Sequence, residues 1–417
     1  MSVIQKEIYA SIEFLQYEIR FTLGEFHNNR LNILNVETYP SNGIDKNNII
    51  NPELLINDIK AMIAVVNKKM FVNVEKVIVV LPSKSLSVNS KRITINVKDK
   101  KITHELVYDT IHNVATRELD SDRILVNATI YKYFIDGVSK SKLTLDKGIN
   151  NLAVDVNLYS SDQATVFNYL NIVEQAGLEI IDICFDSIAM ANEMAAFEAS
   201  QIKNILNIRY ELGQINLSLI SGGRVVSTFS LEKGFVDIVE VLQADHHLSF
   251  EAASNLVLNN SYLNASNLES MPVFLYTSEN ETKAIEDIYL KDIATKILEK
   301  QFSEVYEIID PILMSKETDV YITGKGAGII GLSELLSNVL KTPVQVYLPE
   351  VIGARDSSYV ALLGSLYNYR DTIKLGNESI NQSCLSDEIR VKKDSKYERN
   401  ESEDSMTNKL KELFKFN

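Results

Sequence analysis

The chain has 417 residues, of which 45% are hydrophobic and 24% are charged, and its formal net charge is -14. This composition is typical of a globular protein, and a chain of this length usually divides into several subdomains. The negative charge argues against nucleic acid as a partner, because binding a phosphate backbone requires an excess of lysine and arginine.

No targeting segment, membrane-spanning helix or metal site is expected. The N-terminal residues MSVIQKEIYA lack a basic stretch followed by an apolar run, which argues against a signal peptide. No apolar run approaches the ~18 residues of a spanning helix. Cys184 and Cys384 lie far apart without the spacing of zinc ligands, which favours a reducing compartment. These features predict a cytoplasmic protein.

A three-strand pattern occurs twice in the first 231 residues. Residues 8–38 alternate as three strands joined by turns, and residues 205–231 repeat the plan. Helical patterns follow each unit, at residues 53–70 and 235–258. The repetition suggests an internal duplication, and the mixture predicts an α/β fold with mixed sheets covered by helices. Duplicated lobes usually hold a ligand in the cleft between them.

A glycine turn lies between a predicted strand and a predicted helix in VYITGKGAGIIG, residues 320–331. Glycines let the backbone turn sharply and approach a bound group, and the start of the helix leaves N–H donors unpaired. The pattern indicates a nucleotide site, or else a tight strand-to-helix connection without a ligand. The candidate nucleotide-binding residues of this turn are Gly324, Lys325, Gly326, Ala327 and Gly328.

The chain changes character after Tyr369. Residues 376–405 are polar and predict a disordered linker, and the chain ends in MTNKLKELFKFN. On a helix this ending is apolar on one side and basic along its flanks, which is typical of an interfacial membrane anchor. The alternative is a terminal helix that docks on its own protein. The candidate membrane-binding residues are Leu410, Leu413, Phe414, Phe416, Lys409, Lys411 and Lys415.

Together these segments resemble the FtsA family of bacterial cell-division proteins, membrane-anchored members of the actin superfamily. Residues 320–350 look like the family's adenosine-binding segment, and residues 353–369 resemble its closing helix. Residues 125–137 look like a strand of the 1C subdomain that FtsA carries in place of an actin subdomain. The final helix is similar to the family's membrane-targeting helix.

The resemblance implies an actin-like fold with duplicated lobes and a division into subdomains. These would be 1A (1–82, 160–200 and 330–370), 1C (83–159), 2A (201–227 and 306–329), 2B (228–305), a disordered linker (371–405) and an amphipathic helix (406–417).

The resemblance also implies a function. The protein would polymerise into protofilaments and tether the tubulin-like FtsZ to the inner face of the cell membrane at the division site. Its partners would be the FtsZ C-terminal peptide, bound by subdomain 2B, the lipid surface and further copies of itself. The cofactor of the superfamily is ATP with Mg²⁺.

Both phosphate-binding hairpins depart from the family's pattern. In the first, Glu13 keeps a carboxylate but Leu15 replaces a glycine; in the second, Asn207 replaces a carboxylate, and Arg209 and Tyr210 fill glycine positions. A phosphate cradle needs inward-pointing N–H groups and room to approach, so we expect weak ATP binding or none, and hydrolysis that is weak or lost. Arg209 would pair with a phosphate, or it would only line the cleft or lie at the surface. The hairpins' candidate nucleotide-binding residues are Glu13, Gln16, Asn207 and Gly213.

Two other functions remain open from the sequence. An active ATPase of the same superfamily, such as a sugar kinase or a chaperone, would need intact glycine loops. A pilus-assembly or cell-shape protein would share the fold, which alone does not exclude it. The amphipathic ending favours division over both.

Overall fold

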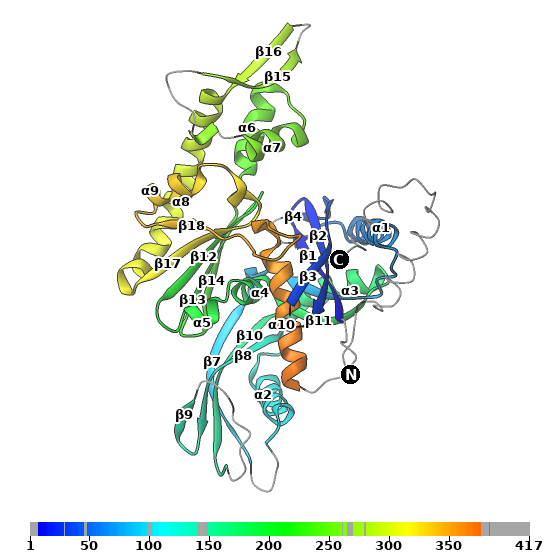
Figure 1. Cartoon of the computed structure of the whole chain (residues 1–417), viewed down its shortest axis with the longest axis vertical. Helices are drawn as coiled ribbons and strands as arrows, with labels where there is room; N and C mark the ends of the chain where they lie inside the picture. Colours follow the sequence, from blue (N-terminus) through cyan, green and yellow to red (C-terminus); the bar gives the residue numbers. More distant parts are fainter. Residues whose placement is uncertain are drawn as a thin grey trace, which may run out of the picture.

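The computed structural model describes residues 7–28, 30–45, 48–97, 102–140, 143, 149–260, 262–264, 270–278, 281–376 and 383. Figure 1 shows two five-stranded sheets at the centre of an elongated molecule and a smaller sheet toward each end. We name the part built on the sheet that contains β1 lobe I, and the part built on the sheet that contains β12 lobe II.

The central sheet of lobe I has the strand order β11-β6-β1-β2-β3. β1, β2 and β3 pair antiparallel in sequence, and β1 also pairs parallel with β6, which pairs parallel with β11. Its strands are β1 (Glu7–Leu15), β2 (Glu18–His27), β3 (Arg30–Pro40), β6 (Lys76–Leu81) and β11 (Glu179–Phe185). The sheet is accompanied by the two-residue strands β4 (Ile44–Asp45) and β5 (Asn48–Ile49) and by α1 (Pro52–Met70), α3 (Gln163–Gln175), α4 (Asp186–Glu193), α5 (Ala196–Ala199) and α10 (Val360–Gly376).

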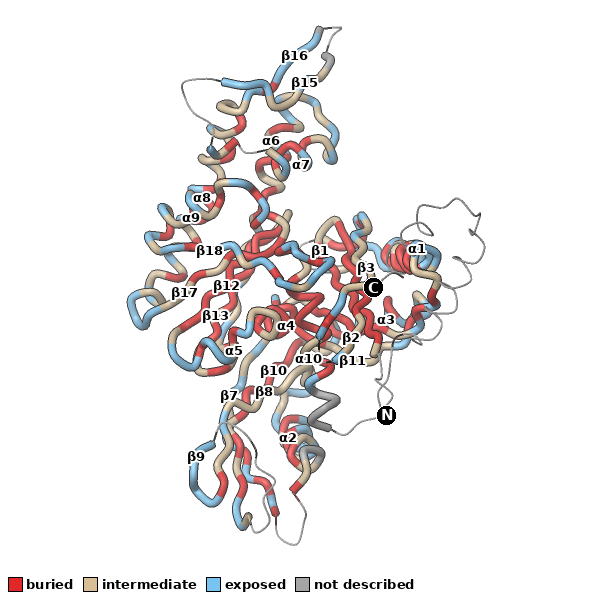
Figure 2. The backbone as a smooth tube through the Cα atoms, viewed as in Figure 1, coloured by how far each residue is buried: buried red, intermediate tan, exposed pale blue. Residues whose placement is uncertain are grey.

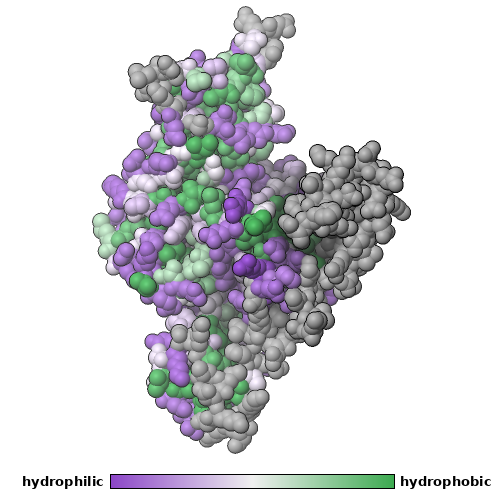
Figure 3. Space-filling model, viewed as in Figure 1, coloured by the Kyte–Doolittle hydropathy of each residue, from purple (hydrophilic) through white to green (hydrophobic). Residues whose placement is uncertain are grey.

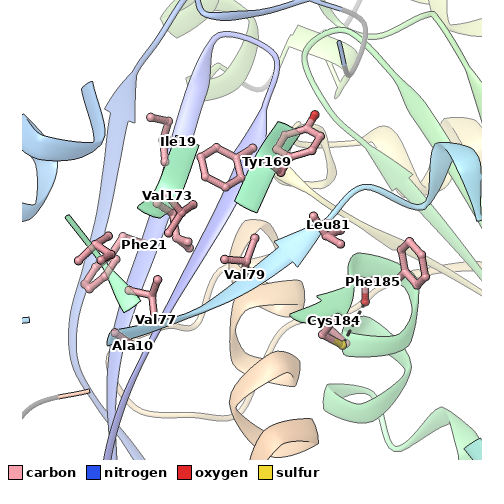
Figure 4. Packing of buried hydrophobic residues seen from close by; sticks show 14 of the residues in the cluster. Ala10, Ile19, Phe21, Val77, Val79, Leu81, Tyr169, Val173, Cys184 and Phe185 are labelled. Atoms are coloured by element: carbon pink, nitrogen blue, oxygen red, sulfur yellow. Dashed lines mark hydrogen bonds between the residues drawn. The ribbon is translucent and has the colours of Figure 1, made fainter. Parts of the chain in front are cut away.

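Helices cover both faces of this sheet. Successive side chains of a strand point to opposite faces, so Ala10 packs toward α1 and α3 while Tyr9 packs toward α10. In Figure 4, Val79 of β6 lies with Tyr169 and Val173 of α3 in the first of these clusters. The strands β1, β2 and β6 are therefore buried on both sides, as the red strands in Figure 2 show, whereas β3 and β11 are only partly buried. Such burial explains the nearly continuous apolar sequence of β6.

Lobe II repeats the arrangement, with the strand order β14-β13-β12-β17-β18. β12, β13 and β14 pair antiparallel in sequence, and β12 pairs parallel with β17, which pairs parallel with β18. The strands are β12 (Asn204–Tyr210), β13 (Ile215–Ser221), β14 (Arg224–Leu231), β17 (Thr318–Thr323) and β18 (Val344–Val346). The same order and directions in both lobes confirm the predicted duplication and the α/β fold.

Each lobe carries an additional unit. In lobe I, β7, β8, β9 and β10 form a four-stranded sheet that packs with α2; the bounds are β7 (Ser87–Ile95), α2 (His104–Glu118), β8 (Arg123–Ile135), β9 (Val138–Lys140) and β10 (Leu152–Asp162). In lobe II the unit contains α6 (Val236–His246), α7 (Phe250–Asn259), β15 (Pro272–Ser278), β16 (Glu281–Glu286) and α8 (Asp287–Ser315). The remaining elements are α9 (Leu332–Val339) and the 3₁₀ turns η1 (Ser83–Ser85), η2 (Tyr262–Asn264), η3 (Lys325–Gly328) and η4 (Ser357–Tyr359).

Some predicted boundaries differ from the structure. The elements α9 and β18 belong to lobe II, because β18 pairs with β17 and Leu336 of α9 packs in the core of that lobe. The predicted start of the last segment of subdomain 1A, at residue 330, therefore lies too early in the chain. The predicted 305/306 boundary falls inside α8. α10 extends to Gly376, past the predicted start of the linker at residue 371.

Ser383, inside the predicted linker, is bound to the first strand of lobe I. Its backbone N–H donates to the carbonyl of Ile8 at 2.9 Å, and its hydroxyl accepts from the N–H of Ala10 at 2.7 Å. The predicted membrane-binding residues, 409–416, lie outside the described residues. Within the described ranges no helix combines the length and apolar character needed to cross a membrane.

Candidate functional site

The predicted nucleotide-binding residues meet where the two lobes face each other. Glu13 lies near the end of β1, Gln16 in the β1–β2 turn, Asn207 in β12, Gly213 in the β12–β13 turn, and residues 324–328 directly after β17. Equivalent strands of the two duplicated sheets thus present their carboxyl ends to one another. Ligands of open α/β sheets usually bind outside such ends.

The tips of the two hairpins contact each other across this site. A Cβ on Gly213 would lie 1.9 Å from Oε1 of Gln16, so only glycine leaves room for the Gln16 side chain. Nε2 of Gln16 donates to Oδ1 of Asp45 at 2.9 Å, which fixes that side chain. The space between the hairpin tips is therefore occupied by a side chain of the protein itself.

Charged side chains from both lobes join behind the hairpins. We call this set the interlobe ion network; it consists of Glu13, Glu18, Arg20, Asp186, Arg209, Glu211 and Lys325. The first six are buried, and Lys325 is partly exposed. Buried charges are stable only when they are paired and hydrogen-bonded, so the pairing described below is a condition for this fold.

Arg20 joins lobe I to Glu211 of lobe II. Its Nη1 and Nη2 donate to Oε1 and Oε2 of Glu211 at 2.9 and 2.8 Å, a bidentate arrangement. Its Nε donates to Oε1 of Glu18 at 2.7 Å, and its Nη1 also donates to the carbonyl of Ser358 at 2.8 Å. Glu13 faces Arg20 across the β1–β2 pair, which places a third carboxyl group nearby.

Arg209 makes the reciprocal connection, from lobe II to lobe I. Its Nη1 lies 2.7 Å from Oε1 of Glu13 and 3.1 Å from Oδ2 of Asp186, and its Nε donates to Oε1 of Glu211 at 3.0 Å. Of the two predicted roles, cleft lining describes Arg209, since carboxylates already engage Nη1 and Nε. Across the described part of the chain, neither Nη2 of Arg209 nor Oε2 of Glu13 has a hydrogen-bond partner.

Burial and pairing set the protonation of the two carboxylates between the arginines. Burial opposes the charge on Glu211, but Arg20 and Arg209 outweigh it and lower the pKa of Glu211 to about 2. Burial dominates at Glu13, where Arg209 and Arg20 offset it only in part, so the pKa of Glu13 is raised. Glu211 is therefore firmly anionic, whereas Glu13 holds a proton more readily than an ordinary glutamate.

The glycine turn packs against lobe II itself. A Cβ on Gly324 would lie 2.6 Å from the carbonyl oxygen of Tyr210, and one on Gly326 would lie 2.4 Å from its ring. Lys325 donates its backbone N–H to Oε2 of Glu211 at 3.3 Å and its Nζ to Oε2 of Glu18 at 2.7 Å. Gly328 has open space where a Cβ would be. The close approach that requires glycine at 324 and 326 is thus made to Tyr210.

The other predicted residues have partners within the protein. Oδ1 of the buried Asn207 accepts from the Thr323 hydroxyl at 3.0 Å, and its Nδ2 lies 3.3 Å from Sδ of Met190. Ala327 is buried in the core of lobe II. The contacts of Asn207 thus engage both polar atoms of its side chain within the protein, and Ala327 has no polar side-chain atom to offer a ligand.

A pocket of about 400 Å³ opens beside the β12–β13 turn. Among the predicted nucleotide-binding residues only Gly213 lines it; the other lining residues are Ser83, Lys84, Gln214, Thr228, Phe229, Ser230, Leu231 and Glu232. The volume is in the range of small-ligand sites. Neither the glycine turn nor the interlobe ion network lines it.

Four residues of the interlobe ion network were not predicted from the sequence: Glu18, Arg20, Asp186 and Glu211. A usable signal was present, because Glu13, Arg20 and Arg209 interrupt apolar strands that are otherwise buried. Charged residues at such positions require partners of opposite sign. Their spacing along the chain gave no indication of which residues pair, since Arg20 and Glu211 are far apart in sequence.

The chain resembles bacterial cell-division proteins along most of its length. It is 22% identical to the cell division protein FtsA of Bacillus subtilis, over 86% of this chain and 82% of the relative. It is 21% identical to the FtsA of Enterococcus faecalis, over 98% of each chain. No protein-family model matches the chain.

Solved structures show the same fold. The PilM-PilN type IV pilus biogenesis complex has a TM-score of 0.59 at 14% identity, covering 86% of this chain and 98% of that one. MreB5 of Spiroplasma citri bound to AMPPNP has a TM-score of 0.52 at 11% identity, covering 88% and 97%. The chain therefore has the actin-like fold predicted from its sequence, and its curated relatives are cell-division proteins.

Proposed function

We propose that the chain is an actin-like adaptor of bacterial cell division, which polymerises and holds the tubulin-like FtsZ at the membrane without hydrolysing ATP. The similarity to FtsA proteins over 82–98% of the relatives' length carries this proposal. The likeness to PilM and MreB rests on fold alone, so it does not favour a role in pilus assembly or cell shape.

The arrangement of the cleft supports the absence of hydrolysis. Phosphoryl transfer needs carboxylates that hold a metal ion and orient the attacking nucleophile. In this chain Glu13, Asp186 and Glu211 are engaged by Arg209, and Asn207 is bound to Thr323.

Membrane attachment in this proposal depends on residues 406–417. A short helix with few apolar residues binds a membrane only weakly by itself, as a single acyl chain does. Polymerisation would present many such helices to one surface and raise the overall affinity by about 10²–10⁴-fold. Assembly and attachment would thus reinforce each other, and FtsZ would be recruited by subdomain 2B.

The experiment compares two variants of the full chain. Phe414→Asp places a charge on the apolar side of the expected helix, and Asn408→Asp places the same charge on the opposite side. We expect vesicles of anionic phospholipid to sediment the wild type and Asn408→Asp, but to leave Phe414→Asp in solution. FtsZ should sediment with the vesicles only when the bound adaptor is present.

Two outcomes would contradict the proposal. Equal sedimentation of Phe414→Asp and the wild type would exclude the helix as the membrane anchor. Failure of the vesicle-bound wild type to recruit FtsZ would exclude the adaptor function.

A further inference from the structure

The carboxylate of Glu211 is surrounded by hydrogen-bond donors from both lobes. Oε1 accepts from Nη1 of Arg20 at 2.9 Å and from Nε of Arg209 at 3.0 Å. Oε2 accepts from Nη2 of Arg20 at 2.8 Å and from the backbone N–H of Lys325 at 3.3 Å. Three separate segments, β2, β12 and the glycine turn, thus converge on one carboxylate.

This donor set has the chemistry of an oxyanion site. A guanidinium binds carboxylate and phosphate groups in a bidentate manner, as Arg20 binds Glu211. Backbone N–H groups of glycine-rich turns are a second common source of anion contacts. Here the N–H of Lys325 follows Gly324, whose φ of 88° is a conformation that favours glycine.

The turn lies close to the carboxylate of Glu211 as well as to Tyr210. A Cβ on Gly324 would lie 3.0 Å from Oε1 of Glu211, closer than most Cβ contacts. A side chain at position 324 would therefore crowd the carboxylate of Glu211 in addition to the backbone of Tyr210. Nη2 of the buried Arg209, a further donor beside this carboxylate, has no acceptor among the residues described here.

We infer that Glu211 is a permanent intramolecular ligand, which occupies an oxyanion site and so joins the two lobes without a diffusible ligand. Because the carboxylate is part of the chain, it is present at a high effective concentration. A free phosphate or carboxylate ion would have to displace it, and wild-type protein therefore leaves the site closed to such ions. The inference concerns the conformation of the chain and does not depend on its role in division.

The test is to remove the intramolecular ligand and supply one from solution. In the full chain, Glu211→Ala vacates the site and leaves Arg20 and Arg209 without their shared acceptor. Its thermal unfolding is followed in sodium formate, sodium phosphate and sodium chloride at equal ionic strength. We expect the unfolding midpoint to fall by several degrees and to rise again, in a saturable way, with formate or phosphate but not with chloride.

Glu211→Gln is the matched control. Its neutral amide fills the same space, so its midpoint should fall without saturable recovery in either oxyanion, and the wild type should show none. The inference is overturned if neither oxyanion stabilises Glu211→Ala more than chloride does. It is also overturned if Glu211→Gln or the wild type gains as much as Glu211→Ala.

A second measurement applies if Glu211→Ala does not fold in plain buffer. The variant is then refolded from urea in formate, phosphate or chloride, and the yield of soluble protein is compared. Recovery in an oxyanion but not in chloride supports the inference. Equal yields in all three salts contradict it. Neither result bears on vesicle binding or FtsZ recruitment, so failure of this inference and failure of the adaptor proposal are distinguishable.

Discussion

Arginine side chains in the cleft depend on several acceptors at once. Arg209 contacts three carboxylates, one of which it shares with Arg20, so the residues form a network rather than separate pairs. A buried ion pair is not in itself a strong source of stability, because desolvation offsets much of the attraction. Removing one partner of such a pair is nevertheless costly, because the other charge is then left buried and unpaired.

At the scale of single residues, we predict that Arg209→Met greatly lowers the free energy of unfolding. The methionine keeps much of the volume but removes the guanidinium that pairs with both Glu13 and Asp186, which should cost about 3–5 kcal/mol of unfolding free energy. Arg92→Met is the control, because the side chain of Arg92, which pairs with Asp155, is 58% exposed. Loss of such a surface ion pair lowers the free energy of unfolding by only about 0–1 kcal/mol. Urea unfolding measures both, and equal losses would show that the buried network has no special role.

At the scale of elements, close packing of α4 and α10 positions the cleft. A Cβ on Gly364 of α10 would lie 1.7 Å from the carbonyl oxygen of Ala189 in α4, so the two helices are in backbone contact there. Asn192 donates to Asn368 across the same helix pair at 3.0 Å. Asp186, the first residue of α4, binds Arg209, so this contact bears directly on the network.

Gly364→Ala should therefore destabilise the protein. Adding a methyl group inside a packed interface forces backbone shifts that cost about 1–3 kcal/mol. Gly328→Ala provides the comparison, because its added methyl group meets no atom within 4 Å and should change the unfolding free energy by less than about 0.5 kcal/mol. Thermal unfolding of both variants tests this, and a Gly364→Ala variant as stable as Gly328→Ala would contradict the packing argument.

The strands and the glycine turn could be predicted because their patterns are local. Alternating and apolar runs located β1, β2 and β3 and their counterparts in lobe II, and glycine spacing located the turn that precedes α9. The helical pattern over residues 235–258 proved to be two helices, since His247 adopts a φ of 53° and Ser249 caps the start of α7. The partners of Arg20 and Arg209 could not be predicted, because they depend on how two distant sheets face each other.

At the scale of the molecule, duplication explains why the network lies between the lobes. Two sheets with the same strand order present equivalent ends to one cleft, and each contributes one arginine to a carboxylate of the other. Hydrophilic and hydrophobic side chains are interspersed on the face of lobe II shown in Figure 3, whereas Arg20, Arg209 and Glu211 of the cleft are buried. The two lobes are thus held together by groups that belong to the chain.

The central claim is that the protein's own side chains take the place of a nucleotide in this cleft. The most direct measurement is calorimetric titration of the full-length protein with ATP and Mg²⁺, together with thermal unfolding at millimolar ATP. A ligand at 1,000 times its dissociation constant would stabilise the folded state by about 4.1 kcal/mol. We predict no saturable heat and no shift of the unfolding midpoint. Saturable binding at micromolar concentrations, with a matching rise of the midpoint, would contradict the account.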